Sequence, residues 1–369
     1  MLLVINAGSS SIKTAVFDDH LQHRFAASVS EIGSTGMLHA GGQRAECIAP
    51  DIEAALRLCL DALATAGLSF DQLTGAAHRV VHGGTAFAQA CRITPQVISA
   101  IEACVPLAPL HNPANLTAIR ALADLFPNLP QYASFDTAFH ATNPKVAVTY
   151  ALPKEPRNLG IRRYGFHGIS YAGIVRKVKE ISENNLPRRL LALHLGNGAS
   201  LCGIVDGLSV ATSMGYSPLD GLTMGTRTGS IDGNAVLRMA EVYGIKEAST
   251  MLNRQSGLLG LGGCNDMRQL HDATTPEAAF AVEHFCYWGL RHAGSMIAAM
   301  GGLDAIAFSG GIGENDEKVR SAIVAGLAFA GAVPVWVIPA EEELTIAMEA
   351  HDVREAEREG RGAQNHPSS

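Results

Sequence analysis

The sequence predicts an α/β fold built from two similar halves, and three observations support this. Apolar runs of strand length alternate with segments of helical length along most of the 369 residues. Three of the apolar runs end in short, glycine-rich turns. Two of these turns share one pattern of strand, Gly-x-Ser turn and strand, over 2–17 and 190–205. This similarity predicts a duplicated fold with a cleft between its halves.

Strand and helix patterns alternate through the first half of the chain. Strand-like runs occupy its start, and Pro95 and the pair Asn112-Pro113 are each typical of a helix beginning. The buried strand that follows the first helix ends at a pair of glycines, and a later strand leads directly into Asp136. The predicted elements are helices over 51–66, 95–104 and 112–126 and strands over 76–81 and 131–135.

A proline-spaced stretch over 144–156 marks the predicted domain boundary. It gives an N-terminal domain over 1–150 and a C-terminal domain over 151–343. We expect a last helix, about 344–356, to pack back onto the N-terminal domain, and the polar segment 357–369 to be a flexible tail. The predicted elements of the second half are helices over 171–181, from 234, from 246 and over 276–300, with strands from 190, over 305–308 and over 335–338.

Composition excludes several classes of protein. The chain is 47% hydrophobic and 17% charged, and its apolar stretches are interrupted before they reach membrane-spanning length. The seven cysteines form no CxxC pair, which argues against a disulfide framework or a zinc site. A net charge of −7 argues against a nucleic-acid partner. Because the N-terminus lacks the pattern of a secretory signal, we expect a cytoplasmic protein without a membrane partner.

The three glycine-rich turns predict a polyphosphate site. Glycine lets the backbone approach a ligand closely, and successive backbone N–H groups can then bind an anion, with Ser and Asn side chains as further donors. Ordinary hairpin turns are the alternative for any single one of them. The turns lie at 6–11, 196–200 and 309–315.

Four further residues are candidates for phosphoryl-transfer chemistry. Arg79 and Arg227 lie beside glycines, where arginines often clamp anions, with a surface salt bridge as the alternative. His167 lies between two glycines just before a helix and could either donate to a phosphoryl group or cap that helix. Asp136 follows a strand at its carboxyl end, where α/β sheets carry functional groups, although a turn or N-cap residue would look the same.

Several segments, in this order, resemble the acetokinase family of short-chain carboxylate kinases, in the actin-like ATPase superfamily. The resemblance covers most of the chain. It implies two duplicated domains of the ribonuclease H-like, actin-like type with ATP in the cleft between them. The segments are NAGSSSIK, HRVVHGG, LAPLHNP, FDTAFH, YGFHG, HLGNGAS, SPLDGLTMGTRTGSID and SGGIGEN.

The resemblance also implies the activity of an acetate kinase. The γ-phosphoryl group of ATP would pass reversibly and in line to acetate, giving acetyl phosphate and ADP. Mg²⁺ would be required, with Mn²⁺ as a possible substitute, and the enzyme would be a homodimer. A carboxylate is already ionised, so no general base is needed, and catalysis reduces to positioning and charge neutralisation.

Site residues follow from the matching positions. The catalytic residues would be Arg79, Asp136, His167 and Arg227, and the acetate methyl would lie among Val81, Leu110, Phe166 and Pro218, with Arg79 binding the carboxylate. Asn6 and Glu342 would surround the metal. Nucleotide binding is assigned to Ser9, Ser11, Lys13, His194, Asn197, Gly198, Asp266, Met267, Arg268, Gly311, Gly313 and Asn315.

Two departures from the family pattern bear on these assignments. Met267 stands where relatives usually have an aromatic residue, which bears on nucleotide preference. The run Glu341-Glu342-Glu343 replaces Asn-Glu-Glu and follows a shortened segment, and such a run is also typical of the first turn of a helix. The alternatives are a kinase of propionate or another short-chain acid and a non-catalytic nucleotide-binding protein on the same fold.

Overall fold

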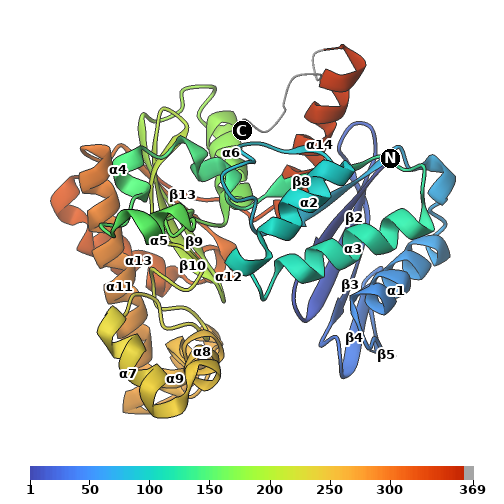
Figure 1. Cartoon of the computed structure of the whole chain (residues 1–369). Coiled ribbons are helices and arrows are strands. Elements are labelled where there is room, and N and C mark those ends of the chain that lie inside the picture. The colour runs from blue at the N-terminus through green and yellow to red at the C-terminus, as the bar shows by residue number, and fades with distance from the viewer. Residues whose placement is uncertain (361–369) are drawn as a thin grey trace. The chain divides into compact units, whose positions relative to one another are not determined.

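The computed structural model describes residues 1–360 and divides the chain into two compact units, each with its own sheet (Figure 1). Unit 1 comprises Met1–Phe139 and the C-terminal part from Glu341, and unit 2 comprises His140–Ala340. The division at Phe139 comes earlier than the predicted boundary at 150–151, because residues 140–150, which include the short helix α4 (Lys145–Val148), group with unit 2. The short helix α5 (Lys154–Asn158) follows in the same unit. Of the predicted tail over 357–369, residues 361–369 lie outside the described residues.

Unit 1 contains a mixed sheet in the order β5-β4-β3-β2-β1-β6-β8-β7. The first five strands form an antiparallel meander, whereas β1, β6 and β8 are parallel neighbours. Three parallel strands place their carboxyl ends at one edge of the sheet. The strands are β1 (Leu2–Ala7), β2 (Ser11–Phe17), β3 (His23–Ser30), β4 (Thr35–Ala40), β5 (Gln43–Ile48), β6 (Gly75–Val80), β7 (Cys91–Arg92) and β8 (Gln131–Phe135).

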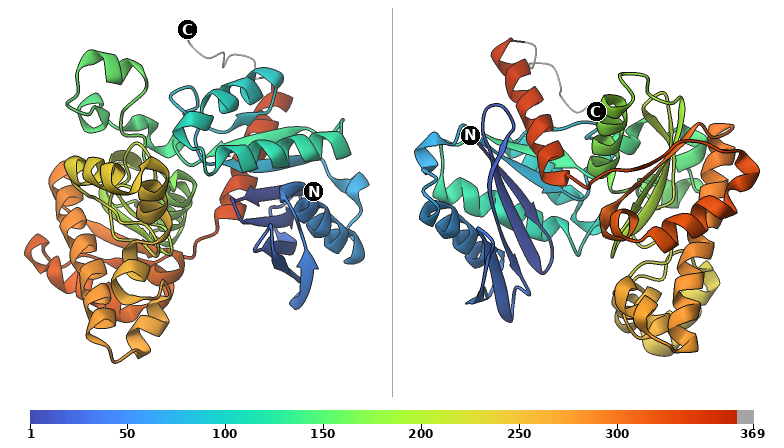
Figure 2. Two further views of the ribbon diagram at one scale, coloured as in Figure 1. Left: turned by 60° about the horizontal axis from the view of Figure 1, so that its bottom comes forward. Right: turned by 180° about the vertical axis from the view of Figure 1, so that it is seen from behind.

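Helices cover both faces of this sheet. One face carries α1 (Ile52–Thr65), α2 (Pro95–Ala103) and α3 (Asn112–Leu125), and their apolar sides form the core with the strands. The C-terminal helix α14 (Glu342–Arg358) packs against β1, β6 and β8 on the other face, as the view from behind shows (Figure 2). Two of these helices begin at residues whose side chains accept a hydrogen bond from the first turn. Asp51 caps α1, and Thr94, directly before Pro95, caps α2.

Unit 2 repeats the central topology of unit 1. Its sheet has the order β11-β10-β9-β12-β13, in which three antiparallel strands are followed by two parallel ones. The strands β3-β2-β1-β6-β8 of unit 1 have the same order and directions, which confirms the duplicated fold. The strands are β9 (Arg189–Leu195), β10 (Ala199–Val205), β11 (Leu208–Thr212), β12 (Ala305–Ser309) and β13 (Val335–Val337).

Two helices cover the sheet of unit 2 from opposite sides (Figures 1 and 2). The long helix α11 (Pro276–Met300) packs against β9, β10 and β11, and α6 (Gly168–Ile181) packs against β9 and β12. The Thr275 side chain caps α11 directly before Pro276. Besides α4 and α5, the other helices of unit 2 are α7 (Gly233–Tyr243), α8 (Ile245–Arg254), α9 (Gly257–Gly262), α10 (Met267–Asp272), α12 (Gly310–Asn315) and α13 (Glu317–Gly326).

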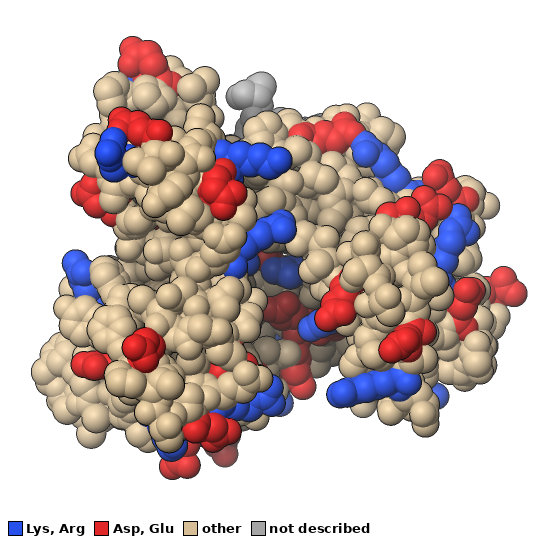
Figure 3. All heavy atoms as spheres, turned by 90° about the horizontal axis from the view of Figure 1, so that it is seen from below, with Lys and Arg blue, Asp and Glu red and all other residues tan. Residues whose placement is uncertain are grey.

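One predicted turn differs from the structure. The segment 309–315 forms the short helix α12, because Gly310 takes a φ of +80° that turns the chain at once and allows a helical turn to follow. Basic and acidic side chains are interspersed over the face shown in Figure 3. Within the described part of the chain, every helix is too short or too polar to cross a membrane.

Candidate active site

Unit 1 brings three of the predicted residues together at the carboxyl ends of its parallel strands. The Arg79 Nε lies 3.0 Å from Asp136 Oδ1, and Arg79 Nη2 lies 2.6 Å from Asp136 Oδ2. Arg79 Nη1 also donates to Asn6 Oδ1 over 3.2 Å. Arg79 is near the end of β6, Asn6 is near the end of β1 and Asp136 follows β8. We call these three residues the Arg79 cluster.

Arg79 remains a cation in this partly enclosed setting. Burial alone would lower its pKa, but Asp136 and Glu342, with a further contribution from Glu343, raise the pKa above its ordinary value. The Asp136 carboxylate is itself buried, with 3% of its side chain exposed. The cluster is therefore a charged pair fixed in two-point geometry, rather than a solvated surface salt bridge.

Hydrogen bonds to side-chain amides fix the loop that follows β6. Asn115 accepts from the Val81 N–H and donates to the Ala7 carbonyl at 2.7 Å, which joins the ends of β6 and β1. Asn112 binds both the N–H and the carbonyl of His82. Val81, a predicted wall of the acetate pocket, is thereby held in a buried position.

The remaining predicted residues of unit 1 lie in three places. Ser9 belongs to the turn between β1 and β2, and Ser11 is the first residue of β2; a 2.8 Å bond from the Gly8 N–H to the Ser11 carbonyl closes this turn. Lys13 follows on β2 with an exposed side chain. Leu110 is exposed. Glu342 lies in the first turn of α14, as expected for an acidic residue near a helix N-terminus, and acts electrostatically on Arg79.

In unit 2, His167 has an unusual backbone conformation at the start of α6. Its φ of +59° places it in the left-handed region, which a residue with a side chain enters at a cost of about 1–2 kcal/mol. The ring does not cap the helix, so that alternative is wrong. Instead, His167 Nδ1 lies 2.8 Å from Ser200 Oγ, and the centroids of the His167 and His194 rings are 4.3 Å apart. Strain of this kind is typical of functional sites.

Two further predicted residues of unit 2, Gly198 and Arg227, lie near His167. A Cβ at Gly198 would lie 3.3 Å from His167 Nε2 and 3.6 Å from Arg227 Nη1, so this glycine lets the imidazole and the guanidinium approach the turn. The Asn197 carbonyl accepts from the Gly225 N–H at 2.9 Å, which ties the turn to the loop that carries Arg227. Arg227 Nη1 donates to the Pro218 carbonyl at 3.1 Å.

The glycine segments after β9 and β12 lie next to each other because these strands are parallel neighbours. A Cβ at Gly196 would lie 3.8 Å from the Gly311 N–H nitrogen. In α12, Asn315 Nδ2 donates to the Gly311 carbonyl at 2.9 Å, and Gly313 is buried. The structure thus brings together in unit 2 two of the three segments predicted to bind phosphate.

The three residues predicted for the adenosine end differ in exposure. The Asp266 side chain caps α10 and forms a two-point ion pair with Arg268, with Nη2 2.6 Å from Oδ2. The Arg268 side chain is 87% exposed, whereas Met267 is buried in unit 2. Of the two predicted apolar residues in this unit, Phe166 is buried and its carbonyl lies 3.0 Å from His140 Nε2.

Sequence reasoning missed the residues that hold the catalytic candidates in place. Asn112 lies within a motif that carries the family resemblance, where the pair Asn112-Pro113 predicts a helix start, and Asn115 lies just beyond that motif. Ser200 lies within another such motif. Tyr171 falls in the helix predicted over 171–181, and its hydroxyl lies 2.5 Å from Ser200 Oγ. The signal that could have identified them is a polar side chain at a position expected to be buried, because such a side chain needs a hydrogen-bond partner.

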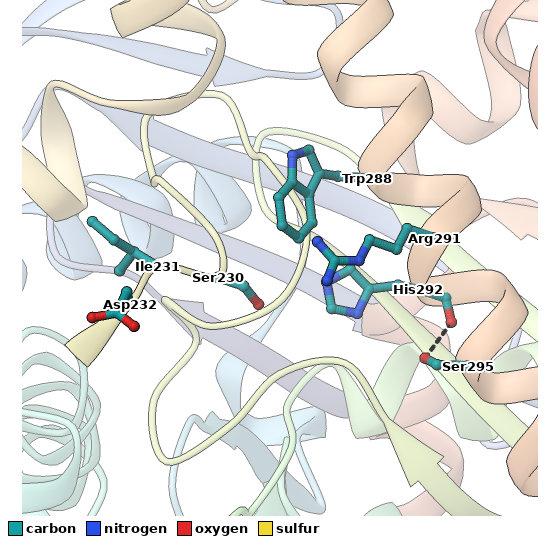
Figure 4. Close-up of a pocket in the computed structure, with 7 residues that line it drawn as sticks. All are labelled: Ser230, Ile231, Asp232, Trp288, Arg291, His292 and Ser295. Atoms are coloured by element: carbon teal, nitrogen blue, oxygen red, sulfur yellow. Dashed lines mark hydrogen bonds between the residues drawn. The ribbon is translucent and has the colours of Figure 1, made fainter. Parts of the chain in front are cut away.

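A separate pocket of unit 2 lies beside α11, and the predicted site residues are absent from its lining (Figure 4). Arg291 stacks on the Trp288 ring, with 4.6 Å between its Cζ and the ring centroid. His292 lies alongside them. Ser230 lines the opposite side and donates to Asp220 at 2.8 Å. The lining residues are Ser230, Ile231, Asp232, Trp288, Arg291, His292 and Ser295.

Comparison with known proteins identifies relatives over nearly the whole chain. Residues 1–335 match the model of the acetokinase family. The chain is 38% identical to the acetate kinase of Rhodopseudomonas palustris over 94% of its own length and 96% of that protein. It is 41% identical to the acetate kinase of Geobacillus kaustophilus, over 94% of its own length and 97% of that protein.

Solved structures agree with this match. The acetate kinase of Porphyromonas gingivalis superposes with a TM-score of 0.88 at 33% identity, covering 96% of this chain and 99% of that one. A propionate kinase from Francisella tularensis superposes with a TM-score of 0.89 at 35% identity, covering 94% of this chain and 98% of that one. The duplicated strand order, the residues at the strand ends and these likenesses place the chain in the acetokinase family.

Proposed function

We propose that the protein is an acetate kinase that transfers the γ-phosphoryl group of ATP to acetate, reversibly and in line, giving acetyl phosphate and ADP. The acetate oxygen forms a new bond to the γ-phosphorus, and the bond from that phosphorus to the bridging oxygen of ADP breaks. No proton is removed from the acceptor, because the carboxylate is already ionised at neutral pH. The protein must therefore supply position and positive charge.

The geometry of the Arg79 cluster is the observation that carries this proposal. Asp136 accepts from Nε and Nη2, so Arg79 is fixed as a cation with a defined orientation at the end of β6. An arginine held in this way is suited to a carboxylate or a phosphoryl group, whose charge it neutralises. Asp136 is positioned to orient the cation, and a general base is not required of it.

Unit 2 supplies the groups that we assign to the nucleotide. His167, Arg227 and the glycine turn at Gly198 converge, and they provide an imidazole, a guanidinium and backbone N–H donors for the oxygens of a transferring phosphoryl group. We assign the phosphate chain also to His194, Asn197 and α12, and adenosine to the segment Asp266–Arg268.

Magnesium fits the oxygen donors that the resemblance assigns to it. Mg²⁺ prefers oxygen ligands and commonly binds through one or two carboxylates together with phosphates and water. Asn6 and Glu342 provide an amide and a carboxylate oxygen of this kind in unit 1. When bound, the ion would neutralise phosphate charge, and Arg79 would orient Asn6 through the bond to Asn6 Oδ1.

Propionate is the second candidate acceptor, because one of the structural relatives is a propionate kinase. A pocket wall discriminates one methylene by only about 1–3 kcal/mol, so a single apolar residue such as Val81 does not decide between the acids. We propose acetate because the curated relatives that match nearly the whole chain are acetate kinases.

The direct test supplies purified protein with ATP, Mg²⁺ and acetate, propionate or butyrate in turn, with hydroxylamine to trap the acyl phosphate. Hydroxamate formed with the highest kcat/KM from acetate is the expected result. A higher value for propionate would retain the mechanism and change the substrate. Binding of ATP without hydroxamate from any acid would overturn the proposal in favour of a non-catalytic nucleotide-binding protein.

We also propose that the protein works as a homodimer in the cytoplasm. Large apolar side chains are exposed on α7, α8 and α11 of unit 2, including Ile245 at 81% and Tyr287 at 60%, which suits a partner of the same kind. Ile245→Glu and Tyr287→Glu should halve the mass measured by light scattering, whereas Ile48→Glu in unit 1 should leave it at two chains.

All seven cysteines are free thiols, which suits the reducing compartment that we propose for this protein, the cytoplasm.

A further inference from the structure

Two buried hydroxyl groups connect to the imidazole of His167. Ser200 Oγ lies 2.8 Å from His167 Nδ1, and Tyr171 Oη lies 2.5 Å from the same Ser200 oxygen. His167 precedes α6, Tyr171 lies one turn into that helix, and Ser200 comes from β10. Both the tyrosine and the serine are fully buried. Side chains from two elements therefore form one short chain of hydrogen bonds that ends on the imidazole.

The direction of each proton in this chain follows from the tyrosine. Burial raises the pKa of Tyr171 well above its ordinary value, so the hydroxyl keeps its proton at any working pH. A phenol is a stronger acid than an aliphatic alcohol and therefore the better hydrogen-bond donor, so Tyr171 directs its own proton along the short bond to Ser200.

Ser200 has a single proton to give. If its oxygen accepts from Tyr171, the hydroxyl proton of Ser200 is available for the other neighbour, the Nδ1 atom of His167. A nitrogen that accepts a hydrogen bond in a neutral imidazole carries no hydrogen, and the hydrogen is then on the other ring nitrogen. The hydroxyl chain thus distinguishes between the two tautomers of His167.

We propose that Tyr171 and Ser200 are positioning residues that hold His167 as the tautomer with its hydrogen on Nε2. That nitrogen faces the turn at Gly198, where a Cβ would lie 3.3 Å away, and Arg227 Nη1 lies 3.6 Å from the same point. The hydrogen is thereby directed to the side on which Arg227 also lies. The catalytic meaning rests on the proposed function, in which His167 donates to the transferring phosphoryl group.

The hydroxyl chain also accounts for how a histidine is kept at this backbone position. The φ of +59° and ψ of 23° at His167 are unfavourable for a side-chain residue, and the packed surroundings must hold them. Ser200 binds the ring from β10, and the neighbouring His194 ring is held by Ser170 Oγ, 2.8 Å from its Nδ1. The two histidine rings are thus each fixed through Nδ1.

The tautomer can be measured directly in the full-length protein labelled with ¹⁵N at histidine. We expect the His167 resonances of neutral imidazole to show an unprotonated Nδ1 and a protonated Nε2. Removing the tyrosine proton with Tyr171→Phe frees Ser200 to accept from Nδ1–H, so the protonated fraction at Nδ1 should rise. A hydrogen on Nδ1 in the wild type, or His167 resonances unchanged by Tyr171→Phe, would overturn the proposal.

Ser209→Ala is the matched control, because Ser209 Oγ lies 2.9 Å from Nδ1 of a different histidine, His140, while it donates to Asn143 Oδ1. It should change the His140 resonances and leave the His167 tautomer as it is. An equal change at His167 would show a general effect of packing and contradict the proposal. The wild-type spectrum decides the tautomer even if a variant fails to fold.

Activity provides a second readout. For Tyr171→Phe we expect kcat to fall about tenfold, a modest part of the usual contribution of a positioned proton donor, with KM for acetate and ATP nearly unchanged. Ser200→Thr, which keeps the hydroxyl, should restore more of kcat than Ser200→Ala. Unchanged kcat in Tyr171→Phe would contradict the catalytic part. Because the spectra need no turnover, an absence of acyl phosphate from any acid would reject the proposed function alone.

Discussion

Arg79 binds Asp136 through both carboxylate oxygens, with Nε 3.0 Å from Oδ1 and Nη2 2.6 Å from Oδ2. The two residues are 57 positions apart in the sequence and meet because β6 and β8 are parallel neighbours. This pair fixes a cation at the edge of the unit 1 sheet, where the proposed reaction needs one. Its burial also makes the pair matter for stability.

Removing the cation should affect both activity and folding. Arg79→Ala removes the cation that pairs with the buried Asp136 carboxylate, so we expect a loss of about 3 kcal/mol in the free energy of unfolding. Turnover should fall roughly 100-fold or more. Urea unfolding and the hydroxamate assay measure the two effects. The double variant Arg79→Ala/Asp136→Ala should recover stability but not turnover, and recovery of turnover would refute the catalytic role.

Arg227 should contribute to activity with little effect on stability. Its Nη1 contacts a backbone carbonyl, that of Pro218, in a partly exposed setting. Arg227→Ala should lower kcat roughly 100-fold, because a guanidinium beside the transferring phosphoryl group is lost, while the melting temperature changes little. Arg238→Ala, which breaks a surface pair with Glu241, is the control and should leave kcat unchanged. Near-normal turnover in Arg227→Ala would remove this residue from the mechanism.

A side chain at Gly225 should disturb the phosphate turn. A Cβ there would collide with the Asn197 side chain, and the Gly225 N–H already binds the Asn197 carbonyl. Gly225→Ala should therefore displace the turn and lower kcat/KM for ATP by about 100-fold, as small misplacements in such sites do. Gly233→Ala, where the added Cβ meets no atom within 4 Å, is the matched control. Equal kinetics of the two variants would show that the turn does not hold ATP.

Glu349 on α14 gives a test of pH dependence. The pKa of Glu349 is raised to about 7, chiefly because the carboxyl group is buried. A hydrogen bond with Ser134 opposes this rise, and the charges of Asp136 and Asp352 add to it. A carboxyl group whose pKa is higher in the folded state stabilises the fold below pH 4.5, and this contribution is lost as the pH rises through about 7.

Glu349→Gln, which imitates the protonated form, should unfold like the wild type at pH 4.5. At pH 8 it should be more stable by up to about 3 kcal/mol. Urea unfolding at the two pH values measures the difference. Glu355→Gln on the same helix is the control. A variant less stable than the wild type at pH 8 would contradict the assigned protonation.

Local sequence patterns predicted much of the fold. The predicted strand over 131–135 is β8, and the predicted helix over 276–300 is α11. The predicted helix over 51–66 is α1, which lacks only the first and last residues of that range. Apolar periodicity, N-cap residues and prolines are local signals, so these elements could be identified without tertiary information. The shared Gly-x-Ser pattern likewise predicted the duplication that the strand order of the two sheets confirms.

Contacts between distant segments could not be predicted in this way. Nothing local indicates that Ser200 meets His167, or that Asn115 joins the ends of β6 and β1, because both contacts depend on how helices α6 and α3 pack against the sheets. The segment 309–315 became a helix rather than a turn because one glycine absorbs the change of direction. The roles of the site residues remain predictions, supported by how the structure groups them within each unit.

The position of an oxygen label tests the central claim most directly. Acetate carrying ¹⁸O in both carboxylate oxygens is incubated with the protein, ATP and Mg²⁺, and the product is cleaved with hydroxylamine. If the acetate oxygen attacks the γ-phosphorus, the phosphate that hydroxylamine releases carries one ¹⁸O atom, and the nucleotide product is unlabelled ADP. Release of unlabelled phosphate, or formation of AMP that carries the label, would contradict the account.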